Sequence, residues 1–135
     1  MFQYQQNGNL IPGIIPASWN EFVGEFGFNP TRQNLLQGLE LAITHLKETG
    51  CSRIFIDGSF VTKKTYPGDY DSCWDIQGVD LNSLSIKYPV LLDLSNKRAN
   101  QKLKYKGELF PTLEMLDFFQ KDRDGSPKGI VQLNF

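Results

Sequence analysis

The stretch "IFIDGSFVTKKTYPGDYDSCWD", residues 54–75, joins an apolar run, a Gly-Ser pair and a second run in which apolar and polar residues alternate. Both runs are typical of β-strands, and the Gly-Ser pair predicts a turn after the first. Side chains alternate across a strand, so Asp69 and Asp71 are expected on one face, about 6–7 Å apart. Carboxylates at this distance repel each other unless a positive charge lies between them. The pattern leaves open whether a metal ion, a lysine or only water serves that purpose.

Two helices are predicted before this stretch. "SWNEFVGEF" begins with Ser18 and has Glu21 three residues later, which is a capping box. Asn29 and Pro30 then provide an N-cap and a proline at the first helical position. The apolar residues that follow recur at helical spacing up to Leu46, and Gly50 is placed to end the helix.

The segments after residue 75 add further elements. "YPVLLDL" is apolar enough for a strand in the middle of the sheet, "PTLEMLDFFQ" predicts a helix, and "KGIVQLNF" predicts a closing strand. The sequence therefore predicts a mixed α/β (α+β) fold, with a mixed sheet of about four to five strands and helices packed on it. We expect a single domain over residues 1–135, in which residues 1–29 form an N-terminal extension and a short helix.

Composition narrows the class of protein. Hydrophobic residues make up 40% of the 135 residues, charged residues 21%, and the net charge is −1. These values indicate an ordinary folded core, with no general attraction to nucleic acids or anionic membranes. No apolar run reaches about 18 residues, so no membrane partner is expected. Two cysteines and an N-terminus without signal-peptide features predict a cytoplasmic protein.

The residues around the Gly-Ser pair favour a phosphate and metal site. Gly58 allows the backbone to approach a phosphate closely, and Ser59 adds a hydroxyl group. Asp69 and Asp71 can hold one or two divalent cations, and Mg²⁺ in particular prefers a few carboxylates together with substrate phosphates. A third carboxylate from a neighbouring strand would complete such a site, and Asp93, at the end of "PVLLD", is the candidate.

This order of motifs resembles the nucleotidyltransferase superfamily, whose catalytic core is similar to the palm of DNA polymerase β. The superfamily pattern is an apolar strand, Gly-Ser, a spacer of similar length to "FVTKKTYPG", Asp-x-Asp and a carboxylate on a later strand. Nearly the whole chain, notably "PVLLDLSNKRANQKLKYKGELFP" and "FFQKDRDGSPKGIVQL", also looks like a short uncharacterised bacterial and phage-borne family of that superfamily. The resemblance implies a minimal palm-like fold.

The same resemblance implies a reaction. An acceptor hydroxyl would attack the α-phosphorus of a nucleoside triphosphate, with ATP the expected substrate and Mg²⁺ or Mn²⁺ bound by Asp69, Asp71 and Asp93. Gly58 and Ser59 would hold the triphosphate. Arg98, Lys102 and Lys104 are candidates to neutralise its β- and γ-phosphates. The acceptor is left open between RNA, protein and a small molecule, and a partner protein in a toxin–antitoxin or phage-defence pair is a further implication of the resemblance.

Two other functions remain open. The typical superfamily enzyme has a further helical domain for which 135 residues leave no room, and this favours an inactive palm-like module that binds a nucleotide or a protein. Alternatively, the five basic residues between positions 97 and 106, with no acid among them, could bind RNA.

Overall fold

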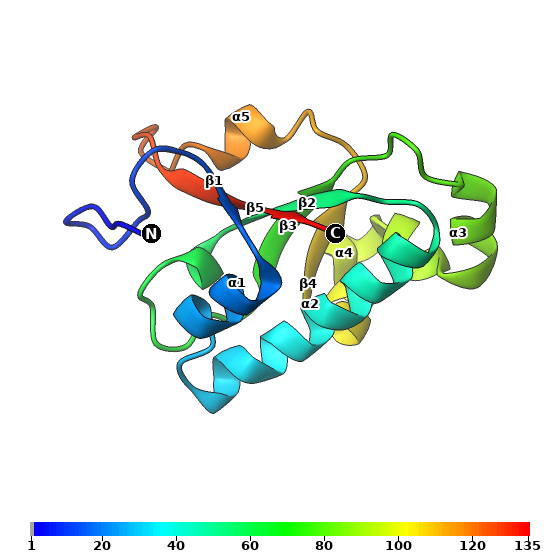
Figure 1. Cartoon of the computed structure of the whole chain (residues 1–135), viewed down its shortest axis with the longest axis horizontal. Coiled ribbons are helices and arrows are strands. Elements are labelled where there is room, and N and C mark those ends of the chain that lie inside the picture. Colours follow the sequence, from blue (N-terminus) through cyan, green and yellow to red (C-terminus); the bar gives the residue numbers. More distant parts are fainter. Residues whose placement is uncertain (1) are drawn as a thin grey trace.

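The chain folds into a mixed β-sheet with helices on both faces (Figure 1). The structure is a computed structural model and describes residues 2–135. The strands in these residues are β1 (Gly13–Ala17), β2 (Arg53–Asp57), β3 (Tyr70–Trp74), β4 (Gly107–Phe110) and β5 (Gly129–Asn134). The helices are α1 (Trp19–Phe26), α2 (Pro30–Glu48), α3 (Leu81–Lys87), α4 (Ser95–Tyr105) and α5 (Leu116–Phe119). Short 3₁₀ turns cover Ser59–Val61 and Pro89–Leu92.

The strands are arranged in the order β1-β5-β2-β3-β4. β2 lies in the centre and pairs antiparallel with both β5 and β3, whereas β1 pairs parallel with β5 and β4 parallel with β3. The prediction of a mixed sheet of four to five strands with helices packed on it is therefore confirmed. The N-terminal extension does more than lead into the domain, because residues 13–17 supply an edge strand.

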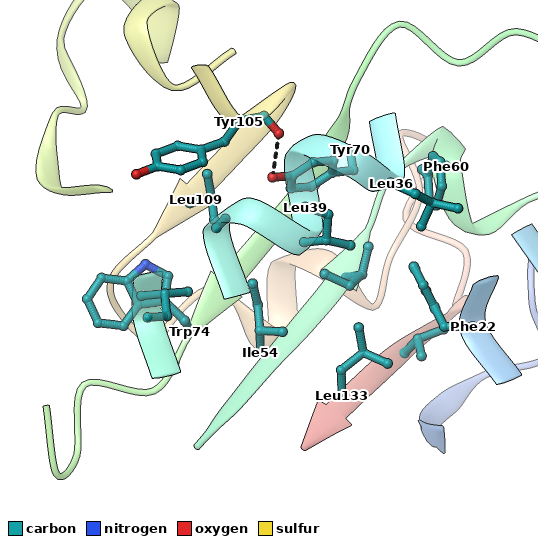
Figure 2. Close-up of a cluster of buried hydrophobic side chains, with 14 of the residues drawn as sticks. Phe22, Leu36, Leu39, Ile54, Phe60, Tyr70, Trp74, Tyr105, Leu109 and Leu133 are labelled. Atoms are coloured by element: carbon teal, nitrogen blue, oxygen red, sulfur yellow. Dashed lines mark hydrogen bonds between the residues drawn. The ribbon is translucent and has the colours of Figure 1, made fainter. Parts of the chain in front are cut away.

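The larger hydrophobic core lies between the sheet and the helices α1 and α2, which cover one face (Figure 1). Figure 2 shows Ile54 of β2 and Leu133 of β5 close to Leu39 of α2 in this core. All three side chains are buried, and each contributes about 1.5–3 kcal/mol relative to an exposed position. The hydroxyl of Tyr70 donates a hydrogen bond of 2.8 Å to the main-chain oxygen of Tyr105, which connects β3 to the end of α4.

The opposite face carries a smaller core beneath α5. Phe55 of β2 and Cys73 of β3 pack there with Phe119 of α5 and Ile130 of β5. Asp57 and Asp71 follow the same alternation as Phe55 and Cys73, so their side chains belong to this face of the sheet. The short α5 covers only part of the face, which leaves the acidic end of β2 and β3 beside open space.

The predicted helix starts are confirmed. Ser18 and Glu21 form both hydrogen bonds of a capping box at α1, and the side chain of Asn29 accepts a hydrogen bond from the Arg32 amide at the start of α2, with Pro30 in the first turn. α2 ends at Glu48, just before Gly50 with its positive φ of 104°.

Two predictions about elements need correction, and two further elements were not predicted. "YPVLLDL" is not a strand: Pro89 opens a 3₁₀ turn, and Leu91 fills the core from that turn. A short apolar run does not distinguish a strand from a buried turn, which is why this prediction failed. The helix predicted over "PTLEMLDFFQ" is limited to Leu116–Phe119. The strand Gly107–Phe110, which was not predicted, takes the place in the sheet that "YPVLLDL" was expected to fill, and it follows a helix that was not predicted either. No helix within residues 2–135 is long and apolar enough to cross a membrane.

Candidate functional site

Three carboxylates lie side by side across neighbouring strands. Asp57 at the end of β2 pairs with Asp71 of β3 in the antiparallel register, and Asp71 pairs with Glu108 of β4 in the parallel register. Directly opposed residues project from the same face of a sheet, so the three form one row. Asp69 precedes β3 by one residue and lies near enough for its pKa to respond to Glu108. We call Asp57, Asp69, Asp71 and Glu108 the acidic row.

Each strand-borne carboxylate of the row is neutralised differently. Asp57 accepts a hydrogen bond of 2.6 Å from the Lys128 ammonium group, and the two side chains are only 8% and 14% exposed. Glu108 accepts a hydrogen bond of 2.7 Å from Arg98 Nε. Asp71 shares a hydrogen bond with Glu108, so a proton between the two carboxyl groups takes the place that a cation has at Asp57. Like charges this close are tolerated only with such partners.

The titration of the acidic row follows from this arrangement. Burial, followed by the hydrogen bond and the charge of Glu108, raises the pKa of Asp71 to about 8. Burial also acts to raise the pKa of Glu108, but the hydrogen bonds from Asp71 and Arg98 outweigh it and lower that pKa. Burial raises the pKa of Asp57 and of Asp69, against the opposing charges of Lys128 and Lys102 respectively. Asp71 is thus the carboxyl that holds a proton near neutral pH.

The turn after β2 is built around Gly58. This residue has φ of 87°, a conformation that favours glycine, and a Cβ placed on it would lie 2.6 Å from Asp71 Oδ2. Ser59 then begins the 3₁₀ turn. The sequence analysis expected Gly58 to allow close approach to a phosphate; the group that it approaches in the structure is the Asp71 carboxylate, so the turn lies directly against the acidic row.

A buried arginine holds the loop that follows this turn. Arg32 of α2 is fully buried, and its guanidinium donates hydrogen bonds to the main-chain oxygens of Phe60, Thr62 and Lys64 at 2.6 to 3.0 Å. A further bond of 3.1 Å goes to the oxygen of Phe26 in α1. All these acceptors are uncharged carbonyl groups, and burial lowers the pKa of Arg32. The Arg32 side chain, which the sequence analysis did not single out, therefore holds the backbone of the loop 58–64 from the side of the core.

A cavity of about 1130 Å³ opens over the acidic row. Gly58, Ser59, Asp57, Asp69 and Asp71 line its floor. Its walls carry basic side chains from two places, the loop after the Gly-Ser turn and the segment before β5: Lys63, Lys64, Lys121, Arg123 and Lys128. A floor of carboxylates with walls of lysine and arginine can accommodate a cation together with a polyphosphate.

The prediction that Asp93 completes the site is wrong. Asp93 ends the second 3₁₀ turn, and its carboxylate accepts hydrogen bonds from the Ser95 amide and hydroxyl and from the Asn100 side chain. It is absent from the cavity lining, and the hydrogen bonds it receives lower its pKa. Asp93 therefore caps the segment that leads into α4, as aspartates commonly do in turns.

Glu108 takes the position that the sequence analysis gave to Asp93. Its strand, "GELF", has four residues and follows a long basic segment, so neither its length nor its surroundings marked it as part of a sheet. The only available signal was the alternation of Glu108 with the buried Leu109, which is a weak indication over so few residues.

The three basic residues predicted to contact phosphates have different positions. Arg98 binds Glu108, and Lys102 lies near enough to lower the pKa of Asp69 and Glu108. Lys104 instead lies over the ring of Tyr105, with its ammonium nitrogen 5.5 Å from the ring centre. Arg98 ends a run of three residues, 96–98, with left-handed backbone angles, an uncommon conformation for residues other than glycine. None of the three basic residues lines the cavity.

The acidic row has the residue types of a metal site but not, as arranged, the geometry of a closed one. Across residues 2–135 no three His, Cys, Asp or Glu side chains converge tightly enough to hold a metal ion. The row accounts for this, since Lys128 and Arg98 each engage one carboxylate and Asp71 is hydrogen-bonded to Glu108. A divalent cation would have to displace the proton that Asp71 shares with Glu108.

Comparison with known proteins gives a family but no function. No curated protein and no solved structure matches the chain. One family does match, over residues 2–134, which is nearly the entire length and includes every residue of the acidic row. The chain therefore belongs to DUF6932, a family of unknown function.

Proposed function

We propose that this protein is a metal-dependent nucleotidyltransferase with a minimal palm-like fold. The observation that carries the proposal is the contact between the Gly58 turn and Asp71, in a row of carboxylates of which Asp57, Asp69 and Asp71 line a cavity with basic side chains around it, and Glu108 adjoins Asp71 outside the lining. The antiparallel pair β2–β3 holds the turn and Asp-x-Asp, and the adjacent strand β4 supplies a third acid. This is the order of features that the superfamily resemblance implies, with Glu108 in place of Asp93.

The donor set fits a divalent cation of the Mg²⁺ or Mn²⁺ type. Asp69, Asp71 and Glu108 would hold it, because hard cations prefer carboxylate oxygens. When bound, the cation would neutralise charge on the reacting phosphate. The pKa of about 8 implies that cation binding releases a proton from Asp71, so affinity rises with pH.

The chain's own residues would provide the remaining parts of the reaction. Gly58, Ser59 and the following main-chain amides approach the triphosphate, with Lys63 and Lys64 beside its outer oxygens. A bond forms between the acceptor oxygen and the α-phosphorus while the bond from that phosphorus to the β-phosphate oxygen breaks, which releases pyrophosphate. Glu108 is ionised and accepts the proton of the acceptor hydroxyl.

An inactive nucleotide-binding module is the second candidate. The two ion pairs, Lys128 with Asp57 and Arg98 with Glu108, favour it, since they neutralise the row without any metal. RNA binding through residues 97–106 is less well supported, because Arg98 and Lys102 face the acidic row and are engaged in its electrostatics.

Titration calorimetry with Mn²⁺ and ATP, followed by an assay of pyrophosphate release with RNA, protein and small hydroxyl compounds as acceptors, tests the proposal. We expect Asp69→Asn and Glu108→Gln to abolish both Mn²⁺-dependent binding and turnover. Asp93→Asn is the matched control and should behave as the wild type. ATP binding that persists in Asp69→Asn, together with no pyrophosphate release by the wild type, would favour the inactive module.

A further inference from the structure

The side chains of Phe118 and Phe119 have opposite environments. Both belong to α5, where successive residues point about 100° apart. Phe119 is 3% exposed and packs in the smaller core, whereas Phe118 is 72% exposed and lines the cavity over the acidic row. A large aromatic ring that is exposed on a cavity wall, among charged side chains, contributes little to the core and is available to a ligand.

A hydrogen-bonded hairpin follows α5. Lys121 and Pro127 form an isolated β-bridge, and the Asp122 carboxylate accepts hydrogen bonds of 2.9 Å from the amides of Asp124 and Ser126. Gln5 ties the hairpin to the N-terminal segment through a bond of 3.0 Å to the Pro127 oxygen. The hairpin therefore carries Lys121 and Arg123 on a hydrogen-bonded turn beside the cavity.

The cavity thus has two separate groups of cations. Lys63 and Lys64 follow the Gly-Ser turn, and Lys121 and Arg123 follow Phe118. The volume of about 1130 Å³ exceeds the range of about 300–1,000 Å³ that is usual for one small ligand. A triphosphate bound at the Gly-Ser turn would not account for the second group of cations, Lys121 and Arg123, or for the exposed ring of Phe118.

We propose that Phe118 is a stacking platform for a nucleobase and that Lys121 and Arg123 hold a phosphate attached to the same nucleotide. An aromatic face beside lysine and arginine is the combination with which proteins bind nucleotides irrespective of the base. This proposal rests on the proposed function for the nature of the ligand. The base belongs either to the triphosphate itself or to a single-stranded nucleic acid that serves as the acceptor, and these two sources share the same chemistry.

The test compares Phe118→Ala and Phe118→Trp with the wild type. Tyr66→Ala is the matched control, because Tyr66 is 70% exposed and lies outside the cavity lining. The probes, each with Mn²⁺, are ATP, inorganic tripolyphosphate, and short single-stranded RNA and DNA oligonucleotides. We expect Phe118→Ala to weaken ATP or oligonucleotide binding about 5- to 100-fold, with tripolyphosphate unaffected and Phe118→Trp close to the wild type.

The outcomes separate the two proposals. A loss confined to ATP places the triphosphate's own base on Phe118, and a loss confined to the oligonucleotides places the acceptor there. Equal binding of every probe by the wild type and Phe118→Ala, or no nucleotide binding by the wild type, would overturn the platform. A Phe118-dependent affinity that ignores both Mn²⁺ and Asp69→Asn would retain the platform and contradict the metal-dependent enzyme.

Discussion

Replacing Asp71 with asparagine should change how the stability of the metal-free protein depends on pH. In the folded chain the pKa of Asp71 is about 8, because the group is buried and hydrogen-bonded to Glu108, against the ordinary value of 3.8. The folded state therefore binds a proton more strongly than the unfolded state between these two values. By linkage, the free energy of unfolding falls as pH rises through this interval. Asparagine imitates the protonated carboxyl and removes the titration.

The size of the effect follows from the slope. A proton held only by the folded state changes the free energy of unfolding by about 1.4 kcal/mol per pH unit, or about 2.7 kcal/mol between pH 5 and pH 7. Solvent still reaches part of the Asp71 side chain and screens its interactions, so about 1–2 kcal/mol is the expected difference. Asp71→Asn should therefore be more stable than the wild type at pH 5 already, and its advantage should grow by this amount between pH 5 and pH 7.

Urea unfolding in EDTA at pH 5, 6 and 7 measures this difference. Asp75→Asn is the matched control, because Asp75 follows the same strand but a hydrogen bond from the Gln77 amide, aided by Arg53, lowers its pKa. A lowered carboxyl pKa affects stability only as pH falls toward that value, so this variant should run parallel to the wild type above pH 5. Parallel curves for Asp71→Asn and the wild type would refute the account of the shared proton.

Three further variants test the surroundings of the site. Gly58→Ala forces a Cβ into contact with the neighbouring carboxylate at an unfavourable φ and should lower the free energy of unfolding by about 1–3 kcal/mol, whereas Gly68→Ala, with open space around it, should change it by less than about 0.5 kcal/mol in the same urea assay. Lys128→Met leaves Asp57 buried without its cation and should cost about 3–5 kcal/mol, much of which Asp57→Asn in the same chain should restore; a double variant no more stable than Lys128→Met would contradict the ion pair. Arg32→Met removes the donors of several buried carbonyl groups and should cost about 3 kcal/mol or more, with faster hydrogen exchange in residues 59–64; unchanged exchange there would show that the loop is held by other contacts.

The sequence was most informative where local chemistry determines structure. The capping box at Ser18 and the Asn29-Pro30 start are formed by residues only three positions apart or fewer, so their pattern is visible in the chain itself. The strands β2 and β3 carry enough β-branched and aromatic residues to be recognised, and alternation is enough to put Asp71 on the same face as Cys73.

Features that depend on contacts between distant segments were missed. Glu108 joins the acidic row only because β4 pairs parallel with β3, more than thirty residues earlier in the chain, and no local pattern specifies that register. Lys128 reaches Asp57 across 71 residues for the same kind of reason. Asp93 was chosen because it ended an apolar run, but the run is apolar because Leu91 fills the core from a 3₁₀ turn.

The way Arg32 holds the loop 58–64 has an evolutionary consequence. Its hydrogen bonds to the loop all go to main-chain oxygens, and the one loop side chain it lies over is the Phe60 ring, so this hold on the loop does not depend on which amino acids occupy positions 63 and 64. Family members can therefore exchange Lys63 and Lys64 for other residues, and so alter which ligands they prefer, while the path of the backbone stays the same. Substitutions at positions 63 and 64 should therefore cost little stability as long as Arg32, which comes from the distant helix α2, is retained.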